Sequence, residues 1–102
     1  MNETNRVLVT GRLGQNPDLK YTKKGEAICI FSIAENNVGL DQPRWHKVVS
    51  WGKLAEASSV HLRQGNLVFV QGRKLTRDYQ TTSGDIRKIE EFKAELIGFS
   101  LT

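Results

Sequence analysis

Aromatic and basic side chains alternate along a short segment near the middle of this sequence. The alternating positions of that segment are Trp45, Lys47, Val49 and Trp51. Because successive side chains of a β-strand point to opposite faces, these residues would share one face. Two indole rings with an ammonium group between them offer a surface on which unpaired bases stack while the cation attracts a phosphate. Stacking tolerates any base, so the pattern predicts binding of single strands without base readout.

The same spacing recurs further along the chain, where Arg73, Leu75, Arg77 and Tyr79 alternate with other residues. A different interpretation of the tryptophans is that they belong to the core, since tryptophan is highly buried on average. Lys47 argues against that interpretation, because a buried ammonium group without a partner is costly. We therefore expect Trp45 and Trp51 at the surface.

The charge of the chain is concentrated in its centre. The 102 residues carry a net charge of +4, and the sequence pI is about 9.5. Between positions 44 and 77 only Glu56 is acidic, whereas seven side chains are basic: Arg44, Lys47, Lys53, Arg63, Arg73, Lys74 and Arg77. Such a segment favours a polyanionic partner. The alternative is a basic surface that is merely solvated.

Several classes of protein are disfavoured by what the sequence lacks. The longest apolar run, Ala27 to Phe31, is far shorter than a membrane helix, and Met1 to Arg6 is too polar for a signal peptide, so we expect a cytoplasmic protein without a membrane partner. One cysteine and two histidines do not form a zinc cluster of the usual spacing. No catalytic motif stands out, so we expect neither an enzyme nor a cofactor.

Three individual residues have structural interpretations. Cys29 lies between isoleucines and is expected to be a small core residue rather than a nucleophile. His46 alternates to the face opposite the tryptophans, which predicts a core or subunit contact, and His61 is expected to pack from a helix.

Hydrophobic periodicity predicts the elements that position these residues. The segment from Ala27 to Ala34 is apolar on both faces, as in a barrel wall. Leu54, Ala57 and His61 recur at helical spacing, and Gly65 just beyond them is expected to stop the helix. Strands are predicted over 7–13, 27–34, 44–51, 67–79 and 86–99, with a short extended piece at 19–21, a helix over 53–63 and a hairpin turn at 82–85.

Five strands with one short helix between the third and fourth is the order of an OB-fold barrel, an all-β architecture. Glycines such as Gly11 stand where a strand of such a barrel must bend. We therefore predict a single OB-fold domain over residues 1–102. The fold alone does not decide the ligand, because OB-folds bind oligonucleotides, oligosaccharides and proteins.

At these residues the sequence resembles the bacterial single-stranded DNA-binding proteins. The resemblance runs from Asn5 to Phe99. It includes the opening segment from Asn5 to Asp18, the central segments Trp45 to Val49 and Trp51 to Glu56, and the segment from Gly72 to Tyr79. The resemblance implies an OB-fold that assembles as a homotetramer and binds single-stranded DNA in replication, recombination and repair.

The resemblance also implies roles for individual residues. Trp45, Trp51 and Tyr79 match stacking aromatics, and His46 matches a histidine near subunit contacts. The basic residues Lys53, Arg63, Arg73 and Arg77 fall in or beside matching basic motifs, and Lys47 completes the expected DNA-binding set.

Two departures from the family pattern bear on function. The segment from Glu35 to Gly39 lacks a further tryptophan that the family commonly has there. The chain stops at Thr102, whereas the family ends in an acidic tip that recruits replication and repair proteins, so such partners are expected only if a tail exists. A tailless paralogue that acts as a dimeric adaptor is therefore the nearest alternative, and an OB-fold nuclease is a third.

Overall fold

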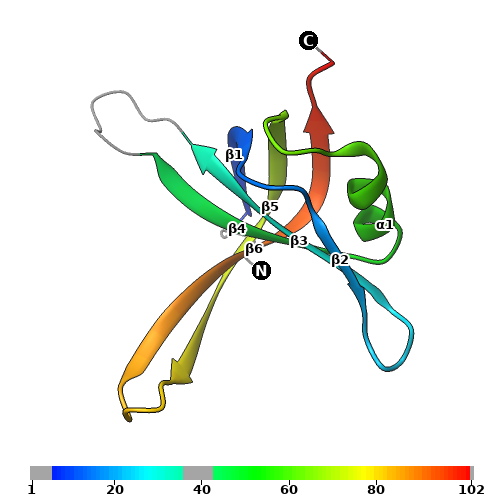
Figure 1. Cartoon of the computed structure of the whole chain (residues 1–102). Coiled ribbons are helices and arrows are strands. Elements are labelled where there is room, and N and C mark those ends of the chain that lie inside the picture. The colour runs from blue at the N-terminus through cyan, green and yellow to red at the C-terminus, as the bar shows by residue number, and fades with distance from the viewer. Residues whose placement is uncertain (1–5, 36–42, 102) are drawn as a thin grey trace.

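The computed structural model describes residues 6–35 and 43–101, without the side chains of 77, 79 and 88–90. Figure 1 shows strands that cross one another around a common centre, with one helix against their side. In chain order the elements are β1 (Arg6–Leu13), β2 (Asp18–Tyr21), β3 (Ala27–Glu35), β4 (Arg44–Trp51), α1 (Gly52–His61), β5 (Leu67–Gln80) and β6 (Ile86–Phe99).

The strands close into a barrel. They follow the order β1-β5-β6-β4-β3-β2, and β1 pairs with β3 as well as with β5, which closes the ring and leaves β2 as an extra strand beside β3. Gly11 lies where β1 passes from one partner to the other, and a Cβ atom there would collide with the carbonyl oxygen of Ala34. The absence of a side chain thus permits the bend. The predicted all-β OB-fold is confirmed.

The core is built by alternation along β3. Cys29, Phe31 and Ile33 are fully buried, whereas Ile28 and Ile30 on the opposite face are half-buried. The prediction that this strand is apolar on both faces is therefore confirmed. Burial raises the pKa of the Cys29 thiol to about 11, with a smaller contribution from Asp18, so the group stays protonated as expected of a small core residue.

Helix α1 corrects two of our predictions. Its buried residues are Ala55 and Ser58, whereas of the predicted apolar spacing Leu54 is partly buried against the core and Ala57 and His61 are exposed. Small side chains form the inner face because α1 packs closely on β3 and β4. A hydroxyl is tolerated there because Ser58 Oγ donates a hydrogen bond to the Leu54 carbonyl oxygen (2.8 Å).

The helix also ends earlier than predicted. Its last residue is His61, and Leu62 has extended backbone angles and a buried side chain. Gly65 does not stop the helix but lies in the turn that follows, with a φ angle of 90°. Its N–H group donates to the Leu13 carbonyl oxygen (2.9 Å), which ties this turn to the end of β1.

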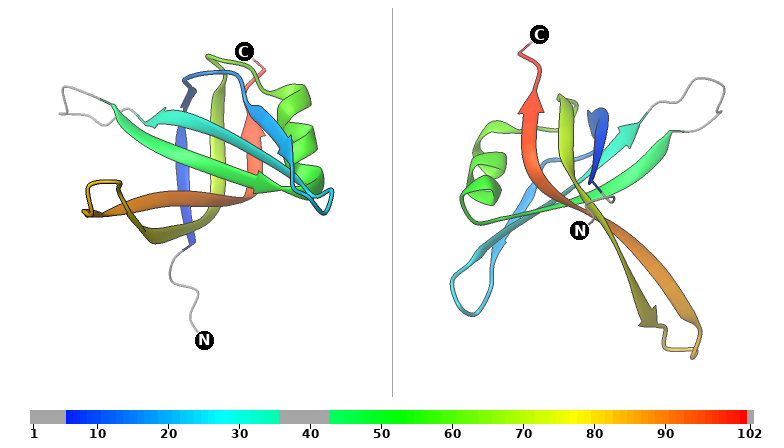
Figure 2. Two further views of the ribbon diagram at one scale, coloured as in Figure 1. Left: turned by 60° about the horizontal axis from the view of Figure 1, so that its bottom comes forward. Right: turned by 180° about the vertical axis from the view of Figure 1, so that it is seen from behind.

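Strands β5 and β6 continue beyond the barrel as a two-stranded ribbon, which Figure 2 shows from two sides. The ribbon ends in the predicted turn, where Gly84 has a φ angle of 94° and its N–H donates to the Thr81 carbonyl oxygen (3.0 Å). In the described part of the chain, no helix is long and apolar enough to cross a membrane.

Candidate nucleic-acid interface

A groove lies on the outer face of the barrel where β3, β4, β5 and β6 meet. Its volume is about 530 Å³, and Ile28, Ile30, Lys47, Val49, Trp51, Leu75, Glu91 and Lys93 line it. Its floor is largely apolar, and its charged groups are two lysines and one glutamate. An apolar trough with a few charged groups suits a ligand that has flat rings and a charged backbone.

Strand register explains why these side chains converge. Ile28 pairs with Trp51, and Ile30 pairs with Val49, so the outward residues of β3 and β4 lie side by side. Val49 in turn pairs with Lys93 of the parallel strand β6. Leu75 of β5 pairs with Glu91, which completes the floor. The predicted alternation on β4 therefore builds one wall of the groove.

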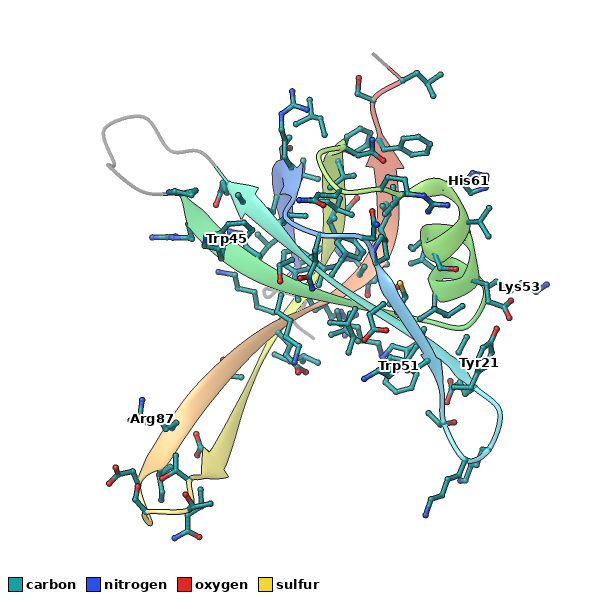
Figure 3. The ribbon with its side chains drawn as sticks, in the orientation of Figure 1. Tyr21, Trp45, Trp51, Lys53, His61 and Arg87 are labelled. Carbon is teal, nitrogen blue, oxygen red and sulfur yellow. The ribbon has the colours of Figure 1, made fainter. Side chains whose placement is uncertain are left out.

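Both tryptophans are at the surface, as predicted. The exposed fraction is 57% for Trp45 and 37% for Trp51. Figure 3 shows the two rings near opposite ends of β4. The six residue steps from Trp45 to Trp51 span roughly 20 Å of strand, longer than one nucleotide.

Trp45 lies against the end of β1. A Cβ atom at Gly14 would come within 2.6 Å of Cζ3 of the Trp45 ring. The Gly14 N–H group donates to the Ser32 carbonyl oxygen (3.0 Å), which fixes the backbone under the ring. A side chain at position 14 would therefore displace Trp45, so the absence of one leaves room for the ring.

Lys47 does not stand alone in the groove. Its Nζ atom lies 3.2 Å from Oε2 of Glu91, a carboxylate that the alternating pattern of β4 by itself does not reveal. Lys47 is neither buried nor without a partner, so it does not carry the cost that an unpaired buried lysine would have. The lysine side chain is 42% exposed, and the carboxylate beside it balances its charge.

Two further cations of the predicted binding set, Lys53 and Arg63, lie in different places. Lys53 is exposed in the first turn of α1, two residues after Trp51, and Figure 3 shows it on the helix side of the barrel. Arg63 lies past the end of α1, where its Nη1 atom donates to the carbonyl oxygens of Ser59 (2.9 Å) and Leu62 (2.7 Å). Arg63 therefore caps the helix and does not line the groove.

The predicted basic face of β5 is only partly described. Arg73 Nε lies 3.3 Å from Oε2 of Glu95, whose other carboxylate oxygen lies 3.2 Å from Arg6 Nη2. The backbones of Arg77 and Tyr79 lie on the ribbon and pair with Ile89 and Arg87, but their side chains are outside the described part. Arg87, labelled in Figure 3, lies on this ribbon, away from the barrel.

The two histidines lie away from the tryptophan face. His46 points to the opposite side of β4, and its Nε2 atom lies 2.9 Å from Oε1 of Glu35. His61 packs as predicted, because its ring stacks on Phe99 with 6.4 Å between centroids, although the residue is exposed. Among the described side chains no three His, Cys, Asp or Glu residues come close enough to hold a metal ion.

Sequence reasoning missed part of the groove. Lys93 is exposed and lies beside Val49, but it comes from a terminal segment with more acidic than basic residues. Its alternation with Glu91 and Glu95 was the available signal, since the three share the spacing of an outward strand face. The segment 35–39, where the family commonly has a further tryptophan, lies largely outside the described residues.

A closed barrel of this strand order, with a helix packed on its side and an open aromatic groove, defines an OB-fold binding protein. The model of the single-strand binding protein family matches residues 4–100. The chain belongs to that family.

Curated relatives agree with this assignment. Two proteins named single-stranded DNA-binding protein, from Neisseria meningitidis serogroup A (strain Z2491) and serogroup B (strain MC58), are each 37% identical over 87 residues. The matched region covers 78% of this chain and 50% of each relative. The chain thus spans about half the length of the curated relatives it matches.

Proposed function

We propose that this chain binds single-stranded DNA without catalysing a reaction and largely without regard to base sequence. The observation that carries the proposal is an open apolar groove with an exposed indole ring in its wall and a second one further along the same strand. Unpaired bases stack on such rings whatever their identity, because every base has a π-face. Replication, recombination and repair, in the bacterial cytoplasm where the DNA lies, are the processes that expose such strands.

The groove residues take distinct roles in this proposal. Trp45 and Trp51 stack bases, and Ile28, Ile30 and Leu75 form the apolar floor beneath them. Lys53 and Lys93 are exposed, and no ion pair to either is present among the described residues. These two lysines, together with Lys47, Arg73, Arg77 and the ring of Tyr79 on the ribbon, form the proposed path of the strand. Arg63 contributes at most from outside the groove.

The binding should weaken steeply as salt rises. Each phosphate that a cation neutralises releases a counterion, with a log–log slope of about −0.7 per contact for single strands. If each protomer neutralises about four phosphates, the slope is roughly −3 per protomer. Fluorescence anisotropy of a labelled oligo-dT, titrated at several salt concentrations, measures it. A slope near zero, or equal affinity for duplex DNA, would contradict the proposal.

We propose that the outer face of β1, β5 and β6 joins copies of this chain into a homotetramer. Leu8 and Leu96 are more than half exposed, and they flank Gln71 from neighbouring strands. Phe69 on the same face is 43% exposed and lies against Gly98. Burying such apolar side chains against a second copy would be favourable. His46 is a further proposed contact, and replication and repair proteins are proposed partners only of a chain with an acidic tail.

Mass in solution tests the assembly. Light scattering or native mass spectrometry should give four copies of the 11.5 kDa chain. Leu8→Lys combined with Leu96→Lys should lower that number, because it places cations on the apolar face. Two copies of the unchanged chain would favour the dimeric adaptor, and a single copy would remove the assembly proposal altogether.

A further inference from the structure

Glu91 is an acidic side chain inside a groove proposed to hold a polyanion. It belongs to β6, its side chain is only 14% exposed, and its Oε2 atom lies 3.2 Å from Lys47 Nζ on β4. Leu75 pairs with it from β5, and Lys93 stands two residues along its own strand. The groove that should attract phosphate therefore has a carboxylate in its floor.

A carboxylate in this position would compete with a DNA phosphate for Lys47. An ammonium group that already has a carboxylate 3.2 Å away gains less from a phosphate than one that faces water. The carboxylate also repels an approaching phosphate, and the repulsion is screened less in a groove than on an open surface. Furthermore, while Lys47 stays paired with Glu91 it neutralises no phosphate, so the counterion condensed on the strand at that point is not released.

We propose that Glu91 sets the affinity of the groove by holding Lys47 in an internal ion pair. The inference rests on the proposed binding of single-stranded DNA and adds its tuning. The pair makes the middle of the groove nearly neutral, so that bases lie over the apolar floor and phosphates follow the rim. The bound strand is consequently held less tightly than the lysines of the groove would allow.

The test is Glu91→Gln, which keeps the shape of the side chain and removes its charge. Affinity for labelled oligo-dT should increase about tenfold at low salt, the effect of removing one nearby like charge. The log–log salt slope should become more negative by about 0.7, because Lys47 then neutralises one more phosphate and the strand releases its condensed counterion there. Glu26→Gln makes the same change of net charge at an exposed residue outside the groove and should change neither quantity appreciably.

A second pair of variants separates competition from mere folding effects. Lys47→Met alone should weaken binding, since it removes the cation that balances the carboxylate of Glu91. Glu91→Gln combined with Lys47→Met removes both charges of the ion pair and leaves the net charge of the groove unchanged, so the affinity and the salt slope should return close to those of the unchanged chain. Thermal unfolding of each variant shows whether the barrel is intact.

Two results would overturn the inference. One is a folded Glu91→Gln variant that binds oligo-dT no more tightly than the unchanged chain. The other is tighter binding with an unchanged salt slope, which would mean that Lys47 is not released. If the unchanged chain itself fails to bind oligo-dT, the proposed function fails instead, so the two failures are distinguishable.

Discussion

Replacing both Trp45 and Trp51 by alanine should weaken binding of oligo-dT by between about 30-fold and about 20 000-fold. Stacking of a base on an aromatic ring is worth about 1–3 kcal/mol, and each ring removes one such contact. The barrel should survive, because both side chains are exposed and neither belongs to the core cluster. Anisotropy of a labelled oligonucleotide measures the affinity without relying on the fluorescence of the deleted indoles.

The control for the tryptophan variant is Val60→Ala, which truncates an exposed apolar side chain on α1 away from the groove. It should bind as tightly as the unchanged chain. If the double tryptophan variant keeps full affinity, the stacking roles are wrong. If it unfolds, the rings belong to the structure of the barrel rather than to its ligand surface.

Phe31→Ala should lower the free energy of unfolding by about 3–5 kcal/mol, the usual cost of truncating a buried phenylalanine. Phe31 is fully buried in the middle of β3, opposite Val48 of β4, so the lost volume leaves a cavity at the centre of the barrel. Urea unfolding at a fixed protomer concentration measures the change, since assembly makes stability depend on concentration.

A matched truncation at the surface checks the reason for that loss. Ile86→Ala, at an exposed position of the ribbon, should change the free energy of unfolding by no more than about 0.5 kcal/mol. Equal losses from the two variants would show that Phe31 is not the centre of the core. Because Phe31 points away from the groove, any Phe31→Ala protein that remains folded should still bind oligo-dT.

Local patterns were sufficient to predict most of the fold. Cys29 was predicted in the core because it lies between isoleucines, and the tryptophans outside because Lys47 shares their face of the strand. The helix face could not be found in this way. Its inner residues Ala55 and Ser58 are small rather than strongly apolar, and closeness to the sheet, not hydrophobicity, selects them.

The site depends more on contacts between strands that are far apart in the sequence. Trp45 and Trp51 were predicted from one strand, but the partner of Lys47 is Glu91, 44 positions later, brought there by the parallel pairing of β4 with β6. The resemblance implied a binding role for Arg63, which stays a prediction, but it could not show that the Arg63 side chain donates to carbonyl oxygens at the end of α1. Pairing of charges across strands decides which cations remain available, and no single segment contains that information.

The central claim is that the indole rings of Trp45 and Trp51 contact unpaired bases, and intrinsic fluorescence tests it most directly. Titration with oligo-dT should quench the tryptophan emission until the groove is saturated, because bases stacked on the rings deactivate them. Trp45→Phe and Trp51→Phe, each with one remaining indole, should both still be quenched. An emission spectrum that stays unchanged at saturating DNA, with binding verified by anisotropy, would contradict the account.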